Sequence, residues 1–128
     1  MKKILIDTDV LINYSFGFNK KLNELIKKQN NNELQLFTNP IIIAEFLNNK
    51  KLDKKKDLIH TEEFLDEFNS VIITKETARI VGGLLRKQTI PFLADAFIAA
   101  SCLQFNLQLY TNNKKDFQKV KGLKLFSF

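Results

Sequence analysis

The sequence is poor in the residues that stabilise small secreted domains or hold structural zinc. It contains one cysteine, Cys102, one histidine, His60, and no tryptophan among 128 residues. A single cysteine excludes an internal disulfide and any metal site built from several cysteines. Cys102 falls within an apolar stretch with helical spacing, so we expect it to be a small core residue. His60 lies among surface-type residues, and we do not expect it to act in catalysis.

Long apolar runs are also missing. No segment approaches the ~18 apolar residues that a membrane span needs. The apolar start of the chain is interrupted by Asp7 and Asp9, far too early for a signal peptide. There is no internal repeat and no long linker, so the length predicts one domain over residues 1–128. We therefore expect a soluble, cytoplasmic protein with no membrane partner.

The composition predicts a folded chain with an affinity for anions. Residues are 45% hydrophobic and 27% charged, which allows a buried core and argues against disorder. The formal net charge of +6 favours an anionic partner such as nucleic acid. Lysine-rich solvated faces, without any such partner, explain the same charge equally well.

Strand patterns alternate with helix patterns along the chain, which predicts an α/β fold with a three-layer sandwich around a mainly parallel sheet. The expected strands are 3–7, 34–38, 71–73, 107–110 and 123–126. The expected helices are 19–30, 39–49, one capped by Thr61, one opened by Thr74, 95–105 and a short turn at 114–119. Residues 50–57 are a charged surface stretch that continues a helix or forms a loop.

Asp7 is the strongest candidate for a functional residue. It directly follows the apolar run Ile4–Ile6, and a carboxylate at the end of a buried strand is costly unless it is solvated, paired or bound to metal. Ligands of open α/β sheets bind beyond the carboxyl ends of the strands, where Asp7 is expected. Asp9, two residues later, is explained more simply as the cap of the next helix.

Other polar residues could reach the same edge, although each has a structural explanation. Glu45 lies beside a buried helical stripe, as a boundary residue of a surface helix would. Asp95 in the first turn of a helix is favoured by the helix dipole by ~0.3–1 kcal/mol. Thr111 and Asn113 follow a predicted strand, as turn residues do, and Asp116 could simply begin a short helix.

The order of these residues resembles a known family. The pattern is Asp7-Thr8 after the first strand, a glutamate in an early helix, Asp95-x-x-Ile98-Ala99-Ala100, then Thr111-x-Asn113-x-x-Asp116-Phe117 and Gly122-Leu123. This looks like the PIN domain, specifically the VapC-like toxin ribonucleases of toxin–antitoxin systems. The resemblance covers nearly the whole chain, although residues 15–90 match only in length and element order.

The resemblance implies a metal-dependent endoribonuclease that hydrolyses RNA with Mg²⁺ or Mn²⁺. Asp7, Glu45 and Asp95 match the first three acidic positions and would be the metal ligands, with Asp116 as a fourth catalytic acid. Many relatives carry Asp where this chain has Asn113, so only Asp116 can supply that charge. Thr111, Asn113, Lys114 and Lys115 would bind the substrate. The implied partners are RNA, a cognate antitoxin protein and a second copy in a homodimer.

Two other readings stay open on the sequence. Asp7-x-Asp9 resembles the opening motif of haloacid-dehalogenase-type phosphatases, but Val10-Leu11 follows where that motif needs Gly-Thr or a close equivalent, and the chain is short for that fold. A non-catalytic PIN module that binds RNA or a protein is the other alternative. The acid set argues against it, and the asparagine at position 113 favours it.

Overall fold

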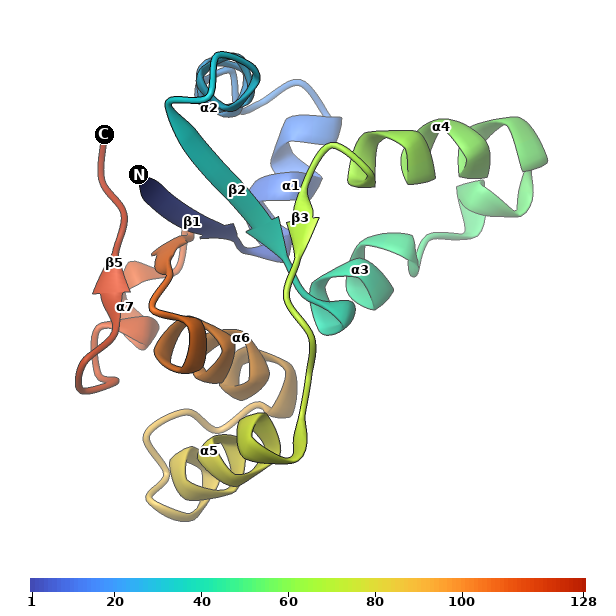
Figure 1. Cartoon of the computed structure of the whole chain (residues 1–128). Coiled ribbons are helices and arrows are strands. Elements are labelled where there is room, and N and C mark those ends of the chain that lie inside the picture. Colours follow the sequence, from blue (N-terminus) through green and yellow to red (C-terminus); the bar gives the residue numbers. More distant parts are fainter.

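The computed structural model describes residues 1–128 and has an α/β fold around a five-stranded parallel sheet (Figure 1). The strands are β1 (Lys2–Ile6), β2 (Leu34–Thr38), β3 (Asn69–Ser70), β4 (Gln108–Tyr110) and β5 (Lys124–Leu125), in the spatial order β3-β2-β1-β4-β5. The helices are α1 (Thr8–Ser15), α2 (Lys21–Asn30), α3 (Pro40–Leu47), the 3-10 helix η1 (Lys50–Asp53), α4 (Lys55–Leu65), α5 (Lys75–Arg86), α6 (Leu93–Phe105) and α7 (Lys114–Phe117). The predicted three-layer parallel-sheet architecture is confirmed.

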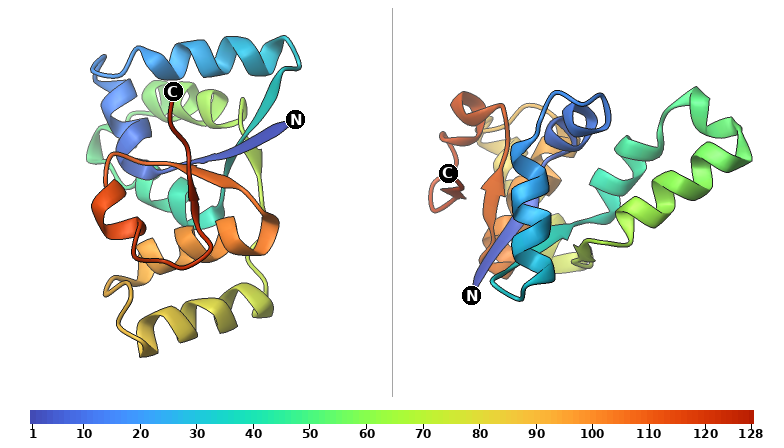
Figure 2. Two further views of the ribbon diagram at one scale, coloured as in Figure 1. Left: turned by 90° about the vertical axis from the view of Figure 1, so that its left-hand side faces the viewer. Right: turned by 90° about the horizontal axis from the view of Figure 1, so that it is seen from above.

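Helices cover both faces of the sheet. Figure 2, left, shows α1 and α2 on one side of the strands and α5 and α6 on the other. Helix α6 contacts β4, and α5 contacts α6 on the side away from the sheet. The α3–η1–α4 segment projects from the body of the fold (Figure 1). None of the helices combines the length and hydrophobicity that crossing a bilayer requires.

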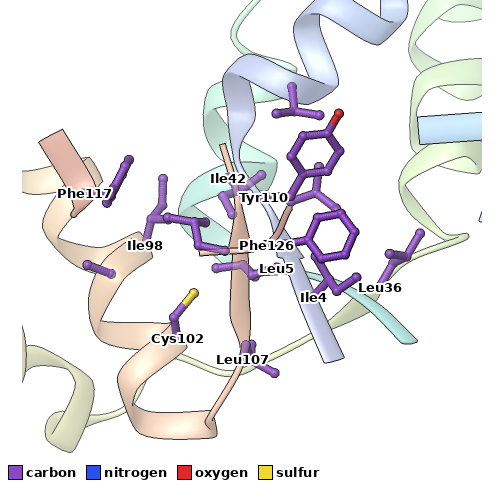
Figure 3. Close-up of a cluster of buried hydrophobic side chains, with 14 of the residues drawn as sticks. Ile4, Leu5, Leu36, Ile42, Ile98, Cys102, Leu107, Tyr110, Phe117 and Phe126 are labelled. Carbon is purple, nitrogen blue, oxygen red and sulfur yellow. The ribbon is translucent and has the colours of Figure 1, made fainter. Parts of the chain in front are cut away.

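The core lies between these layers and is built from aliphatic side chains. Ile4, Leu5 and Ile6 of β1 are fully buried because the strand is covered on both faces, as the continuous apolar run predicts. Ala96, Ala99 and Ala100 of α6 are also fully buried, and their small size lets the helix approach the sheet. Figure 3 shows Cys102 within this cluster, where it is 2% exposed, so its predicted core role is confirmed.

Capping residues fix several helix ends as the sequence predicts. The Asn39 side chain accepts a hydrogen bond from the Ile42 amide at 2.8 Å, and Pro40 occupies the first turn of α3. Thr74 caps α5 in a reciprocal arrangement with Thr77. Asn106 ends α6 in the left-handed conformation, with φ of 55°.

The largest differences from the sequence prediction concern α1, α4, β3 and α6. Helix α1 is missing from the expected ranges, and the cap of the helix after β1 is Asp7 instead of Asp9. Helix α4 begins at Lys55 instead of Thr61, so the charged stretch is η1 and the start of α4. Strand β3 is the edge strand Asn69–Ser70 instead of 71–73, and Ile72, which follows it, is 66% exposed. Helix α6 begins at Leu93, two residues before Asp95.

Candidate active site

The register of β1 and β4 positions Asp7 at the carboxyl edge of the sheet. Ile6 pairs with Tyr110, so the residues that follow each strand, Asp7 and Thr111, lie side by side. The Asp7 amide donates to the Tyr110 carbonyl at 2.9 Å, and the Thr111 hydroxyl donates to Asp7 Oδ2 at 2.7 Å. The other carboxylate oxygen, Oδ1, accepts from the Thr8 amide at 2.7 Å. Asp7 is only 5% exposed, and these hydrogen bonds hold its carboxylate in one orientation.

Helix α3 brings Glu45 to the same edge. The hydroxyl of Thr8 donates to Glu45 Oε1 at 2.7 Å, which joins the residue after Asp7 to a glutamate far along the chain. Helix α3 starts directly after β2 and contacts both α1 and α6. Thr8 thus links the segment that carries Asp7 to Glu45, while a shared metal role of the two acids stays a prediction.

Helices α6 and α7 supply two further carboxyl groups. Asp95 lies in the first turn of α6, and Asp116 lies in α7. The side-chain Nδ2 of Asn113 donates a hydrogen bond to Asp116 Oδ2 at 3.0 Å. The pKa of Asp95 is raised by burial first and then by the charges of Glu45, Asp116 and Asp9. These groups are therefore close enough to repel one another.

The electrostatics of Asp7 are unusual for an aspartate. Burial raises its pKa from 3.8 to about 7, and the negative charges of Asp9 and Asp95 act in the same direction. The hydrogen bonds from Thr111 and Thr8 lower the pKa, but less than burial raises it. At neutral pH the folded protein therefore holds Asp7 near the midpoint of its titration.

Asp9 belongs to the same cluster, contrary to the expectation that it serves only as a helix cap. Its pKa is raised by burial first, lowered by the backbone amides of Asn112 and Val10, and raised by the charge of Glu45. Its Oδ1 atom is buried and has no hydrogen-bond partner. In the sequence, helix capping is enough to account for an aspartate at position 9. Only its spacing of two residues from Asp7 indicated that it could join the acidic cluster.

No basic side chain neutralises the cluster. The one salt bridge of the chain joins Arg79 to Glu76 at 3.3 Å, and both side chains are largely exposed. The clustered carboxyl groups are Asp7, Asp9, Glu45, Asp95 and Asp116. They do not form a ready-made metal site, because no three or more Asp, Glu, His or Cys side chains meet the geometry of one. A concentration of negative charge thus stands uncompensated in a chain whose net charge is +6.

A family model matches most of the chain. The PIN domain model matches residues 4–123, which include every member of the acidic cluster. The chain belongs to the PIN domain family.

Individual relatives of this PIN domain agree with the family match. It is 31% identical to Ribonuclease VapC1 of Methanocaldococcus jannaschii over 97% of this chain and 87% of the relative. A toxin–antitoxin complex from Klebsiella pneumoniae contains a chain with 26% identity and a TM-score of 0.70, with 94% of each chain covered. The structure of VapBC2 from Rickettsia felis bound to a promoter DNA fragment contains a chain with a TM-score of 0.79, 21% identity and 98% of each chain covered. The expected resemblance to VapC-like PIN proteins is confirmed.

The remaining sequence candidates occupy different positions in this PIN domain. Thr111 is only 1% exposed, and its hydroxyl donates to Asp7 while accepting from the Asn113 amide at 2.9 Å. The Lys114 ammonium donates to Ser127 Oγ at 3.3 Å, toward the C-terminal segment of the chain. Lys115 is exposed, and His60 is exposed on α4, outside the acidic cluster.

Proposed function

We propose that this chain is a metal-dependent endoribonuclease that hydrolyses phosphodiester bonds of RNA and is the toxin of a toxin–antitoxin pair. The observation that carries the proposal is the acidic cluster at the carboxyl edge, which combines Asp7, Asp9, Glu45, Asp95 and Asp116 without a basic counter-charge. The relationship to Ribonuclease VapC1 supports RNA as the substrate. We also propose a cytoplasmic location, where cellular RNA would be its substrate.

The chemistry of the cluster suits Mg²⁺ or Mn²⁺. Both ions prefer hard oxygen ligands, and the cluster offers carboxylates only. The buried and unpartnered Oδ1 of Asp9 is an oxygen that lacks a donor or a cation. Carboxylates that repel one another also keep apart until a cation neutralises them, so we expect side-chain rotations to complete the ligand set.

Each acid has a proposed role. Asp7, Asp95 and Glu45 would hold the cation, and the unpartnered Oδ1 of Asp9 would add negative charge beside it. Asp116, whose Oδ2 accepts a hydrogen bond from the side-chain Nδ2 of Asn113, would act as the fourth acid of the cluster, directly or through a water. A cation held by these carboxylates would supply Lewis-acid chemistry: a lower pKa for a bound water, and positive charge against the negative charge that develops on the phosphodiester.

The neighbouring polar residues would orient the acids and the substrate. Thr111 is buried, and we propose that it positions Asp7 instead of contacting RNA, since its hydroxyl already donates to Asp7 Oδ2. Asn113 is only partly exposed and would position Asp116 in the same way, beside the substrate. Exposed Lys115, together with Lys114, would attract the phosphate backbone.

A groove beside the acidic cluster fits an antitoxin segment. It has a volume of about 370 Å³ and is lined by the apolar side chains of Ile12, Phe16, Phe46 and Leu52, together with Glu45. Phe16 is 58% exposed and lies 6.2 Å from Phe18, measured between ring centroids, so the groove continues an exposed apolar surface. A protein partner seated here would shield the cluster from RNA.

We also expect the chain to form a homodimer.

The proposal is tested by RNA cleavage with a matched active-site variant. The wild type is expected to cleave single-stranded RNA with Mg²⁺ or Mn²⁺ and to be inactive in EDTA, while Asp7→Asn folds and does not cleave. The control Asp66→Asn changes an exposed aspartate at the end of α4 and should retain activity. A wild type that binds RNA but cleaves none under these conditions would identify a non-catalytic module.

A further inference from the structure

A small pocket opens directly beside the acidic cluster. It has a volume of about 90 Å³, and its lining includes Asp95 and Asp116. Its inner wall is apolar, because Ile90 is 3% exposed and Phe117 is 1% exposed. Figure 3 shows Phe117 at the margin of the core. The pocket therefore joins an apolar wall to two carboxyl groups of the proposed catalytic site.

Phe92 forms part of this pocket in an unusual position for a large apolar residue. It is 66% exposed, and it takes part in none of the aromatic pairs of the chain. It is the N-cap residue of α6, a position that Ser, Thr, Asp or Asn usually fills. Phe92 and Asp95 both line this pocket. The fold gains little from burying this ring, which points to a ligand.

Lys119 is the basic side chain of the pocket. It is exposed and forms no salt bridge. The pocket thus presents an aromatic face, an apolar wall and a cation, next to carboxylates that would hold a metal. A nucleotide needs this combination, because its base stacks on aromatic rings and its phosphate pairs with cations.

We propose that this pocket is a subsite for one nucleobase flanking the cleaved bond, with the base against Phe92 and an adjacent phosphate at Lys119. The inference rests on the proposed ribonuclease function and identifies part of its substrate contact. A pocket of about 90 Å³ admits the edge of a flat ring and is too small for a folded peptide segment. The base must be unstacked to enter, so the substrate would be single-stranded.

The test measures RNA binding without cleavage. Fluorescence anisotropy of a labelled single-stranded RNA of about six nucleotides, in EDTA and low salt, compares wild type with Phe92→Ala, Phe92→Tyr and Phe18→Ala. Phe18 is 80% exposed and does not line the pocket, so it controls for loss of an exposed ring. Phe92→Ala should weaken binding about 5- to 150-fold, which is the loss expected for one stacked base. Phe92→Tyr should retain affinity, and Phe18→Ala should match wild type.

Abasic substitution at each RNA position locates the base that is bound. One position should reproduce the loss caused by Phe92→Ala, and combining that abasic RNA with Phe92→Ala should cause no further loss. Lys119→Gln should lower the slope of log affinity against log salt by about 0.7, the value for one phosphate contact on a single strand. Lys121→Gln, an exposed lysine outside the pocket, should leave the slope unchanged.

Equal RNA affinity for wild type and Phe92→Ala would overturn the subsite. If sedimentation or antitoxin binding of Phe92→Ala changed at the same time, Phe92 would be a protein contact. Because binding is measured in EDTA, a wild type that fails to cleave RNA contradicts the proposed function, while the position-specific loss still decides the subsite.

Discussion

Replacing Asp7 with asparagine should change how the stability of the metal-free protein depends on pH. The folded state keeps a proton on Asp7 up to about pH 7, whereas the unfolded chain releases it near its ordinary pKa of 3.8. Between these values the native state binds more protons, so the free energy of unfolding falls as pH rises. Asp7 thus destabilises the metal-free fold at neutral and higher pH.

The size of the effect follows from the same pKa. Raising it from 3.8 to about 7 corresponds to about 4 kcal/mol, at about 1.36 kcal/mol for each factor of ten in the equilibrium constant. Asparagine carries no charge but reproduces only part of the hydrogen bonding to Thr8 and Thr111, a loss of about 0.5–1.5 kcal/mol. Asp7→Asn should therefore be more stable than wild type at pH 8 by about 2–4 kcal/mol and no more stable at pH 4.

The assay is urea unfolding at several pH values between 4 and 8, in EDTA, for wild type, Asp7→Asn and the control Asp66→Asn. The difference between wild type and Asp7→Asn should grow with pH, while the control should follow wild type. Adding Mn²⁺ at pH 8 should stabilise wild type more than Asp7→Asn, because bound cation relieves the same repulsion. If the free energies of unfolding of wild type and Asp7→Asn depended on pH in the same way, the pKa of Asp7 would not be raised by folding, and the reasoning would be refuted.

Three further predictions concern the rest of the site. Asp116→Asn should weaken Mn²⁺ binding and cleavage by about 10–100-fold if Asp116 acts through a water, which is a smaller loss than Asp7→Asn should cause. Asn113→Asp should tighten Mn²⁺ binding in calorimetric titrations. Unchanged Mn²⁺ affinity and cleavage rate for Asp116→Asn would remove Asp116 from the site. Thr111→Val removes a hydrogen bond that lowers the pKa of Asp7, so the rising limb of the pH–rate profile should move to higher pH, with Thr111→Ser close to wild type; an unmoved limb would contradict the positioning role. Phe16→Asp should abolish binding of a cognate antitoxin and leave RNA cleavage intact, whereas Ile72→Asp, at another exposed apolar residue, should retain antitoxin binding.

The sequence predicts the frame of the site well, because strong local signals fix it. The apolar run before Asp7 marks a buried strand, and the end of that strand places the carboxylate at the edge of the sheet. Asn39 and Thr74 mark helix starts through their capping side chains. An apolar run or a capping residue thus locates the start or end of an element from only a few neighbouring residues.

Asp9 could not be assigned from sequence, because its role depends on which residue begins α1. With Asp7 as the cap, Asp9 falls in the first turn and faces Glu45 and Asp95, which come from distant helices. Helix α1 itself was missed, since Val10 and Ile12 favour strands and tertiary packing overrides that preference. The start of α4 among lysines gave no capping signal either, because Lys54 makes no side-chain cap.

The most direct test of the account is the location of Mn²⁺ in crystals of the active protein, by its anomalous scattering. The account predicts a peak between Asp7 and Asp95, with carboxylate oxygens at about 2.1 Å, the distance typical of a small divalent cation, and with Glu45 or Asp9 turned toward it. An active, Mn²⁺-dependent protein whose peak lies elsewhere, with these carboxyl groups unchanged, would contradict it.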